Sequence, residues 1–127
     1  PHYQRMEELS VMKELGIQVE GWAPFAEGLK GMFTEPVLQE IAEKHGKTVP
    51  QIILRWDIQQ NVVIIPKSVH QNRMEENLTI WDFELDHEDM EKIAQLDKNV
   101  PSMLDCSKPS EIDRLYDYLN NPVLTSL

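Results

Sequence analysis

The chain contains a single cysteine, Cys106, among 127 residues. One cysteine cannot form a disulfide within the chain, which is typical of proteins kept in a reducing compartment. Long apolar runs are also missing, so no segment is expected to span a membrane, and no signal peptide is visible. No group of histidines and cysteines has the spacing of a metal site. We therefore expect a cytoplasmic globular protein with neither a disulfide nor a bound metal.

Positive charge is the second scarcity. The chain has 12 lysines and arginines against 22 aspartates and glutamates, a net charge of −10. Nucleic acids are bound by broad basic surfaces, so this balance argues against a nucleic-acid partner. It also makes two cations that lie close together in the sequence, Lys67 and Arg73, more noticeable.

These cations follow the most apolar stretch of the chain. Residues 62–65 read Val-Val-Ile-Ile, which is typical of a parallel strand covered on both faces. A short polar helix is expected to begin near Gln71, directly after Pro66-Lys67-Ser68. The free N–H groups and positive dipole at a helix start attract phosphate, and Arg73 adds a planar fork that suits two phosphate oxygens. The pattern predicts an anion site, but a solvated strand-to-helix loop explains the same residues, and motifs this short favour that simpler interpretation.

Strands alternate with helical segments along the chain. Strands are expected at residues 17–22, 62–65 and 79–85, the last with Trp81, Phe83 and Leu85 on one face. Helices are expected from Met6 to Leu15, from Pro36 to Gly46, from the capping-box pattern at 48–51 onward, near Gln71, from Asp86 to Leu96, and after Ser110. This alternation predicts an α/β fold with a parallel sheet. His45 is expected to cap a helix end, and His2 to lie in solvent.

Three strands are too few to close a (β/α)₈ barrel, and an open sheet would leave unpaired edges. The chain also opens on Pro1-His2-Tyr3 without an initiator methionine. We therefore expect a piece of a larger α/β fold, or a subunit that a partner completes.

Four segments in order resemble the C-terminal portion of the aldo-keto reductase family, from about the end of its fifth strand. They are Pro1-His2-Tyr3, residues 19–25 (Val-Glu-Gly-Trp-Ala-Pro-Phe), Leu54-Arg55-Trp56, and Ile65-Pro66-Lys67-Ser68 followed by Arg73, Glu76 and Asn77. The likeness runs from residue 1 to about 99, and Trp22 and Val69 resemble prokaryotic-type members. It implies a (β/α)₈ TIM barrel that binds NADPH across its C-terminal face. Residues 1–127 would be the C-terminal portion of that barrel domain, not closed by itself, with a tail and short helix at residues 100–127.

The resemblance assigns cofactor contacts by position. Trp22 matches the aromatic residue that stacks on the nicotinamide, and Ala23, Pro24 and Phe25 match the loop along the pyrophosphate. Many relatives have serine where this chain has Ala23, which puts one side-chain hydrogen bond to phosphate in doubt.

The second group of contacts would hold the adenosine half of NADP(H). Lys67, Ser68 and Arg73 match the surroundings of the 2′-phosphate, and Val69 would add its backbone. Glu76 and Asn77 match the adenine-side contacts.

The catalytic tyrosine, lysine, aspartate and histidine of the family lie in its first four βα units, so no residue of this segment matches them. We expect the intact enzyme to reduce small aldehydes or ketones with NADPH, and the segment alone to be inactive. The alternative is a non-catalytic half-barrel that binds a nucleotide or associates through its open sheet edges. Because an open partial barrel exposes apolar strand flanks, we expect a dimer, a complex with the missing N-terminal half, or poor solubility.

Overall fold

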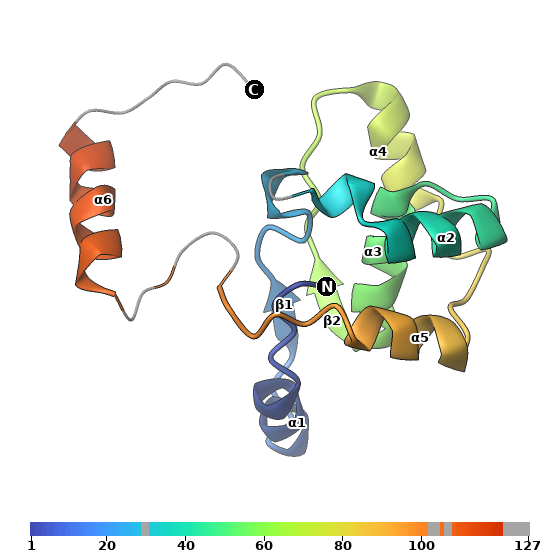
Figure 1. The fold of residues 1–127 in the computed structure, drawn as a ribbon, viewed down its shortest axis with the longest axis horizontal. Helices are drawn as coiled ribbons and strands as arrows, with labels where there is room; N and C mark the ends of the chain where they lie inside the picture. Colours follow the sequence, from blue (N-terminus) through green and yellow to red (C-terminus); the bar gives the residue numbers. More distant parts are fainter. Residues whose placement is uncertain (29–30, 102–104, 106–107, 121–127) are drawn as a thin grey trace.

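The computed structural model describes residues 1–28, 31–101, 105 and 108–120. Within them the chain is a mixture of helices and two short strands (Figure 1). The elements, in order, are α1 (Met6–Glu14), β1 (Val19–Gly21), the 3₁₀ turns η1 (Ala26–Gly28) and η2 (Met32–Thr34), α2 (Pro36–His45), α3 (Val49–Gln59), β2 (Val62–Ile64), α4 (Gln71–Leu78), α5 (His87–Ala94) and α6 (Pro109–Asn120).

The two strands form a parallel pair, with Val19 opposite Val62 and Gly21 opposite Ile64. The connection between them runs through α2 and α3, so the predicted α/β unit with a parallel sheet is confirmed. Among the described residues the sheet has these two strands, is open and does not close into a barrel. The expectation that residues 62–65 are covered on both faces is wrong. α3 packs on β2, but Val63 is 42% exposed and Ile65 is 64% exposed.

The third expected strand, at residues 79–85, is absent from the described structure. Within the described residues this segment pairs with no strand, because polar side chains of α3 bind its backbone instead. Gln51 Nε2 donates to the Thr79 carbonyl over 3.0 Å, and the amide of Gln59 bonds both the N–H and the carbonyl of Leu85, at 2.8 and 2.9 Å. The prediction that Trp81, Phe83 and Leu85 lie on one face is also wrong, since Trp81 is 67% exposed while Leu85 is buried.

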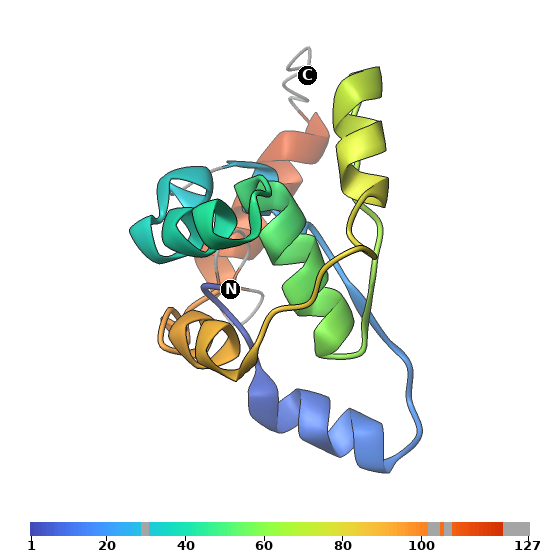
Figure 2. The same cartoon turned by 90° about the vertical axis from the view of Figure 1, so that its right-hand side faces the viewer.

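The core lies between α2, α3 and α5, as Figure 2 shows from the side. Its fully buried side chains include Leu38, Ile41, Ile52, Ile53 and Ile93. The predicted capping residues of the helices around this core are confirmed. Gly46 follows α2 with φ +61°, the Gln51 side chain accepts the Thr48 N–H at the start of α3, and the Asp86 carboxylate accepts the Asp89 N–H at the start of α5.

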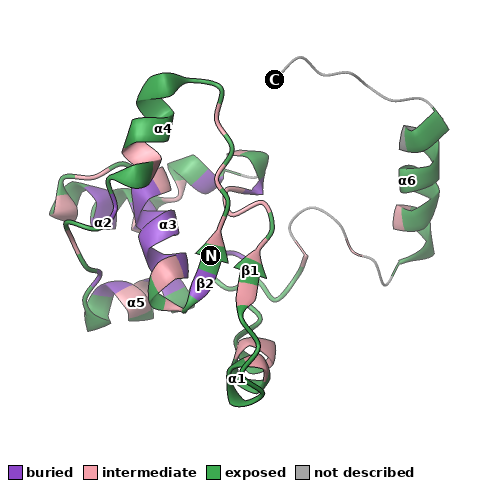
Figure 3. Cartoon of the chain, turned by 180° about the vertical axis from the view of Figure 1, so that it is seen from behind, coloured by how far each residue is buried: buried purple, intermediate pink, exposed green. Residues whose placement is uncertain are grey.

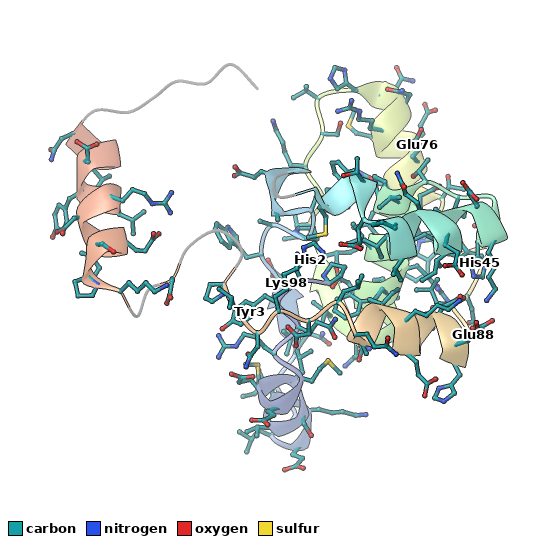
Figure 4. All side chains as sticks on the ribbon, in the orientation of Figure 1. His2, Tyr3, His45, Glu76, Glu88 and Lys98 are labelled. Atoms are coloured by element: carbon teal, nitrogen blue, oxygen red, sulfur yellow. The ribbon has the colours of Figure 1, made fainter. Side chains whose placement is uncertain are left out.

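The N-terminal residues pack against the end of α5. The Gln4 side chain donates to the Ile93 carbonyl over 2.7 Å, and the Lys98 N–H donates to the His2 carbonyl over 2.9 Å. Figure 4 labels His2 and Lys98 at this meeting point. The expectation that His2 is solvated is wrong: it is buried, with Nε2 3.2 Å from the Glu35 carboxylate.

The two outer helices show the predicted apolar spacing but bury little. α1 has no buried residue. In α6, Ile112, Leu115, Tyr116 and Leu119 stay exposed, and Figures 1 and 3 draw this helix apart from the others. None of the helices that the structure describes has the length and apolar character needed to cross a membrane.

Candidate functional site

The two segments that carry the candidate cofactor residues leave the sheet at one edge. β1 ends at Gly21 and β2 ends at Ile64, and these two residues are directly paired. Because the strands are parallel, both following loops start from the carboxyl end of the sheet, where open α/β sheets bind ligands. Residues 22–25 and residues 65–77 therefore begin side by side although more than forty residues separate them in the sequence.

The loop after β1 turns sharply. Ala23 has φ +49°, a conformation that L-residues rarely adopt. Trp22 is 73% exposed and, with Ala23 and Pro24, lines a hollow of about 330 Å³. Phe25 lies differently: its ring packs on Phe33, with centroids 5.8 Å apart, at the edge of the core. The indole of Trp22 is thus open to stacking, while the Phe25 ring mainly supports the loop.

The loop after β2 prepares the start of α4. The Ser68 hydroxyl accepts the His70 N–H over 3.1 Å, which closes a tight turn directly before the helix. Lys67 and Arg73 lie on either side of this turn and are exposed. Within the described residues neither forms an ion pair, whereas Lys44 and Lys92 each pair with two carboxylates. Two unpaired cations at a helix start, in an acidic chain, favour a bound anion.

Glu76 and Asn77 lie at the other end of α4 and are half-buried, and Figure 4 labels Glu76 there. Asn77 lines a second hollow of about 540 Å³, together with Pro66, Met74 and Trp81. The two segments that carry the ten candidate residues leave the sheet at one edge, and neither of these two hollows is lined by all ten. The site is an open surface with two hollows.

The roles of two buried polar residues, Gln51 and Asp57, could not be predicted from the sequence. Gln51 lies beneath α4 and hydrogen-bonds its last turn. The capping-box pattern identified this residue, but only its role at the start of α3. Asp57 lines the first hollow beside Trp56, and burial raises the pKa of Asp57 to about 7, against the opposing effect of the nearby Pro1 amino group. No sequence pattern marks Asp57, because its burial depends on tertiary packing around α3.

Metal chemistry finds no support in the described residues. No group of three or more histidine, cysteine, aspartate or glutamate side chains in them is placed to hold a metal ion. Cys106 lies outside the described residues.

Known proteins resemble this chain in sequence and in fold. Glyoxal reductase of Bacillus subtilis (strain 168) is 48% identical over 99 residues, which is 78% of this chain and 35% of that protein. Methylglyoxal reductase DkgA of Escherichia coli (strain K12) is 46% identical over 82 residues, covering 65% of this chain and 30% of that protein. The solved structure of a Bombyx mori aldo-keto reductase in complex with NADP superposes with a TM-score of 0.76 at 31% identity, covering 84% of this chain and 37% of that one.

This chain thus spans about a third of the length of the curated relatives it matches. The sequence model of one family, described as the aldo/keto reductase family, matches residues 2–98. That match includes both strands, both loops at the carboxyl edge of the sheet, and helices α1 to α5. The chain belongs to the aldo/keto reductase family.

Proposed function

We propose that this chain is the C-terminal portion of a prokaryotic-type, NADP-dependent aldo-keto reductase that reduces small aldehydes or ketones to alcohols. In the intact (β/α)₈ barrel this segment would bind NADP(H), and the preceding part would supply the catalytic residues. The family membership, the glyoxal and methylglyoxal reductases among its relatives, and the NADP complex of a structural neighbour support the proposal.

The observation that carries the proposal is the direct pairing of Gly21 with Ile64. It brings an exposed indole, Trp22, and an unpaired cationic turn, Lys67 to Arg73, to the same edge of one sheet. NADP suits both features at once, because its nicotinamide is a flat ring and its adenosine half carries the 2′-phosphate.

The residues present fit the cofactor by their chemistry. Lys67 and Arg73 would hold the 2′-phosphate that distinguishes NADP from NAD, with Ser68 and the backbone of Val69 beside them. Glu76 and Asn77 would contact the adenine, and Ala23, Pro24 and Phe25 would follow the pyrophosphate. NADPH supplies the hydride when bound, and Trp22 would fix which face of the nicotinamide is presented. No residue of this chain is proposed to move the proton, so the chain alone is expected not to reduce carbonyls.

The experiment that tests this site is a titration of the 127-residue chain with NADPH and NADH, followed by tryptophan fluorescence. We expect NADPH to bind more tightly, because only it carries the 2′-phosphate. Lys67→Ala and Arg73→Ala should each weaken NADPH binding about tenfold and leave NADH binding nearly unchanged. Lys13→Ala is the matched control, since Lys13 is another exposed cation, on α1, with no ion pair in the described structure. Equal affinity for the two nucleotides, or an equal loss in the Lys13 variant, would contradict the proposal.

A second candidate function is non-catalytic self-association. The exposed side chains of Val63, Ile65 and Trp81 beside β2 favour it, because an apolar surface next to an unpaired strand edge invites a further strand. Sedimentation of the pure chain distinguishes the two. A stable dimer that binds neither nucleotide supports self-association, and a species that binds NADPH supports the reductase segment.

A further inference from the structure

One buried side chain, Gln51, joins the ends of two helices. Its Oε1 accepts the N–H of Thr48 over 2.9 Å, at the start of α3. Its Nε2 donates to the carbonyls of Glu76 and Thr79 over 3.1 and 3.0 Å, at the end of α4. Helix starts have free N–H groups and helix ends have free carbonyls, so a single amide satisfies groups of both kinds.

α4 has little else to hold it in place. It contains no buried residue, and Figure 3 shows α4 mostly exposed where the neighbouring α3 is mostly buried. A surface helix normally gains its position from an apolar face packed on the core. Gln51 itself is only 6% exposed. Its hydrogen bonds take the place of that packing at the C-terminal end of α4, so the orientation of α4 depends on them.

We propose that Gln51 is a positioning residue for NADP(H): it acts through α4, on the helix that presents Arg73, Glu76 and Asn77 to the adenosine half of the cofactor. This inference rests on the proposed function. A helix that tilts out of position would move Arg73 relative to Lys67, and the 2′-phosphate would then lose contacts that need both cations in register. It would also move Glu76 and Asn77 relative to the adenine.

The chemistry of the amide gives a sharp test. In Gln51→Glu the ionised side chain can still accept the Thr48 N–H, but a carboxylate cannot donate to the Glu76 and Thr79 carbonyls. The capping interaction of α3 is therefore kept while the link to α4 is lost. Gln51→Met, neutral and similar in length, loses both ends and shows whether a buried charge accounts for the effect of the first variant.

The chain offers a matched control in Gln59, eight residues further along α3. Its amide likewise donates to a backbone carbonyl, that of Leu85, over 2.9 Å. Gln59→Glu makes the same chemical change on the same helix but leaves the link to α4 intact.

The first readout needs no nucleotide. Amide hydrogen exchange across residues 71–79 should become about tenfold faster in Gln51→Glu and Gln51→Met, while exchange in α2 stays slow and Gln59→Glu resembles wild type at residues 71–79. Unchanged exchange of α4 in both Gln51 variants would overturn the inference whether or not NADP(H) binds.

The second readout is selectivity. In the Gln51 variants the affinity for NADPH should fall about tenfold relative to the affinity for NADH. General destabilisation would lower both affinities together and leave their ratio unchanged. If the wild-type chain binds NADPH and the ratio of NADPH to NADH affinity is unchanged in the Gln51 variants, only the inference about Gln51 is overturned. Absence of NADPH binding by the wild-type chain would overturn the proposed function as well.

Discussion

The Nε2 atom of His45 lies 2.7 Å from the carboxylate of Asp89, a side chain with no solvent exposure. Lys44 donates to the other oxygen over 2.8 Å, and that carboxylate also accepts the Asp86 N–H. Burial disfavours the charged form of Asp89, but the hydrogen bonds from Lys44, His45 and the backbone outweigh it and lower the pKa of Asp89. The end of α2 is thereby joined to the first turn of α5 through one carboxylate. His45, expected only to cap a helix, links two helices.

Replacing this carboxylate should be costly. We expect Asp89→Ala to lower the free energy of unfolding by about 3 kcal/mol, because it leaves Lys44 and His45 without their buried partner. Urea denaturation at neutral pH measures the loss. Asp82→Ala is the control, since Asp82 pairs with Lys47 at the surface and its removal should change stability far less than Asp89→Ala does. Because the folded pKa of Asp89 is lowered, its contribution is present above pH 3.8, its ordinary value, and is lost as the pH falls further.

Asp57 should show the opposite dependence on pH. Its folded pKa is raised to about 7 from an ordinary 3.8, so the folded state holds this proton more tightly and stability falls as the pH rises from about 4 to about 7. Asp57→Asn should remove that decline and raise the melting temperature at pH 8 by roughly 5 °C. Melting curves from pH 5 to pH 8 check this. A wild-type protein equally stable across that range, or an Asn variant that melts lower at pH 8, contradicts the assignment.

Trp22 should matter for the cofactor and not for the fold. Because its side chain is 73% exposed, Trp22→Ala should change the free energy of unfolding by less than about 0.5 kcal/mol. If the indole stacks on nicotinamide, the same variant should lose most of the fluorescence quenching that NADPH causes. Trp81→Ala provides the comparison, since Trp81 is nearly as exposed, at 67%, and lies outside the proposed contacts. Quenching that persists in the Trp22 variant and vanishes in the Trp81 variant would contradict the prediction, because the nucleotide would then bind at the hollow lined by Trp81.

Arg55 should stabilise through the backbone that it binds more than through its ion pair. It is 7% exposed and its guanidinium reaches the Ile80 carbonyl at 3.4 Å and the Glu84 carboxylate at 3.0 Å. Arg55→Leu should lower the free energy of unfolding by about 2 kcal/mol. Glu84→Ala should cost less than about 0.5 kcal/mol, because the Glu84 side chain is 82% exposed. Equal losses in the two variants, measured by urea denaturation, would show that the ion pair is the main contribution.

Local signals in the sequence predicted most of the helices correctly. Gly46, the Thr48–Gln51 pattern and Asp86 act within a few residues of their own position, so they can be identified without knowing the fold. The alternation at residues 79–85 predicted a strand and was wrong, because the backbone partners of that segment are side chains of α3. Gln51 and Gln59 lie more than twenty residues away, and no periodicity within 79–85 contains that information.

The candidate site was likewise only partly predictable from the sequence. Lys67, Ser68 and Arg73 could be grouped from their spacing beside an apolar run, and Trp22 could be added only through the family resemblance. That the two groups start at one edge follows from the pairing of β1 with β2, which is a tertiary relationship. Their contacts with NADP(H) stay predictions that the titrations above decide. The two hydrogen bonds from Gln51 to the end of α4 could not be predicted at all, since they depend on where α4 lies.

The hydrogen bond from Lys98 to His2, reinforced by Gln4 on the Ile93 carbonyl, places the two limits of the family-matching segment beside each other. A polypeptide that enters this segment at residue 2 leaves it at residue 98 from almost the same point. Such a geometry is what circular permutation requires. We expect a chain in which a short linker bridges residues 98 and 2, and new termini open at the exposed turn around Asn61, to keep the order of the helices in space.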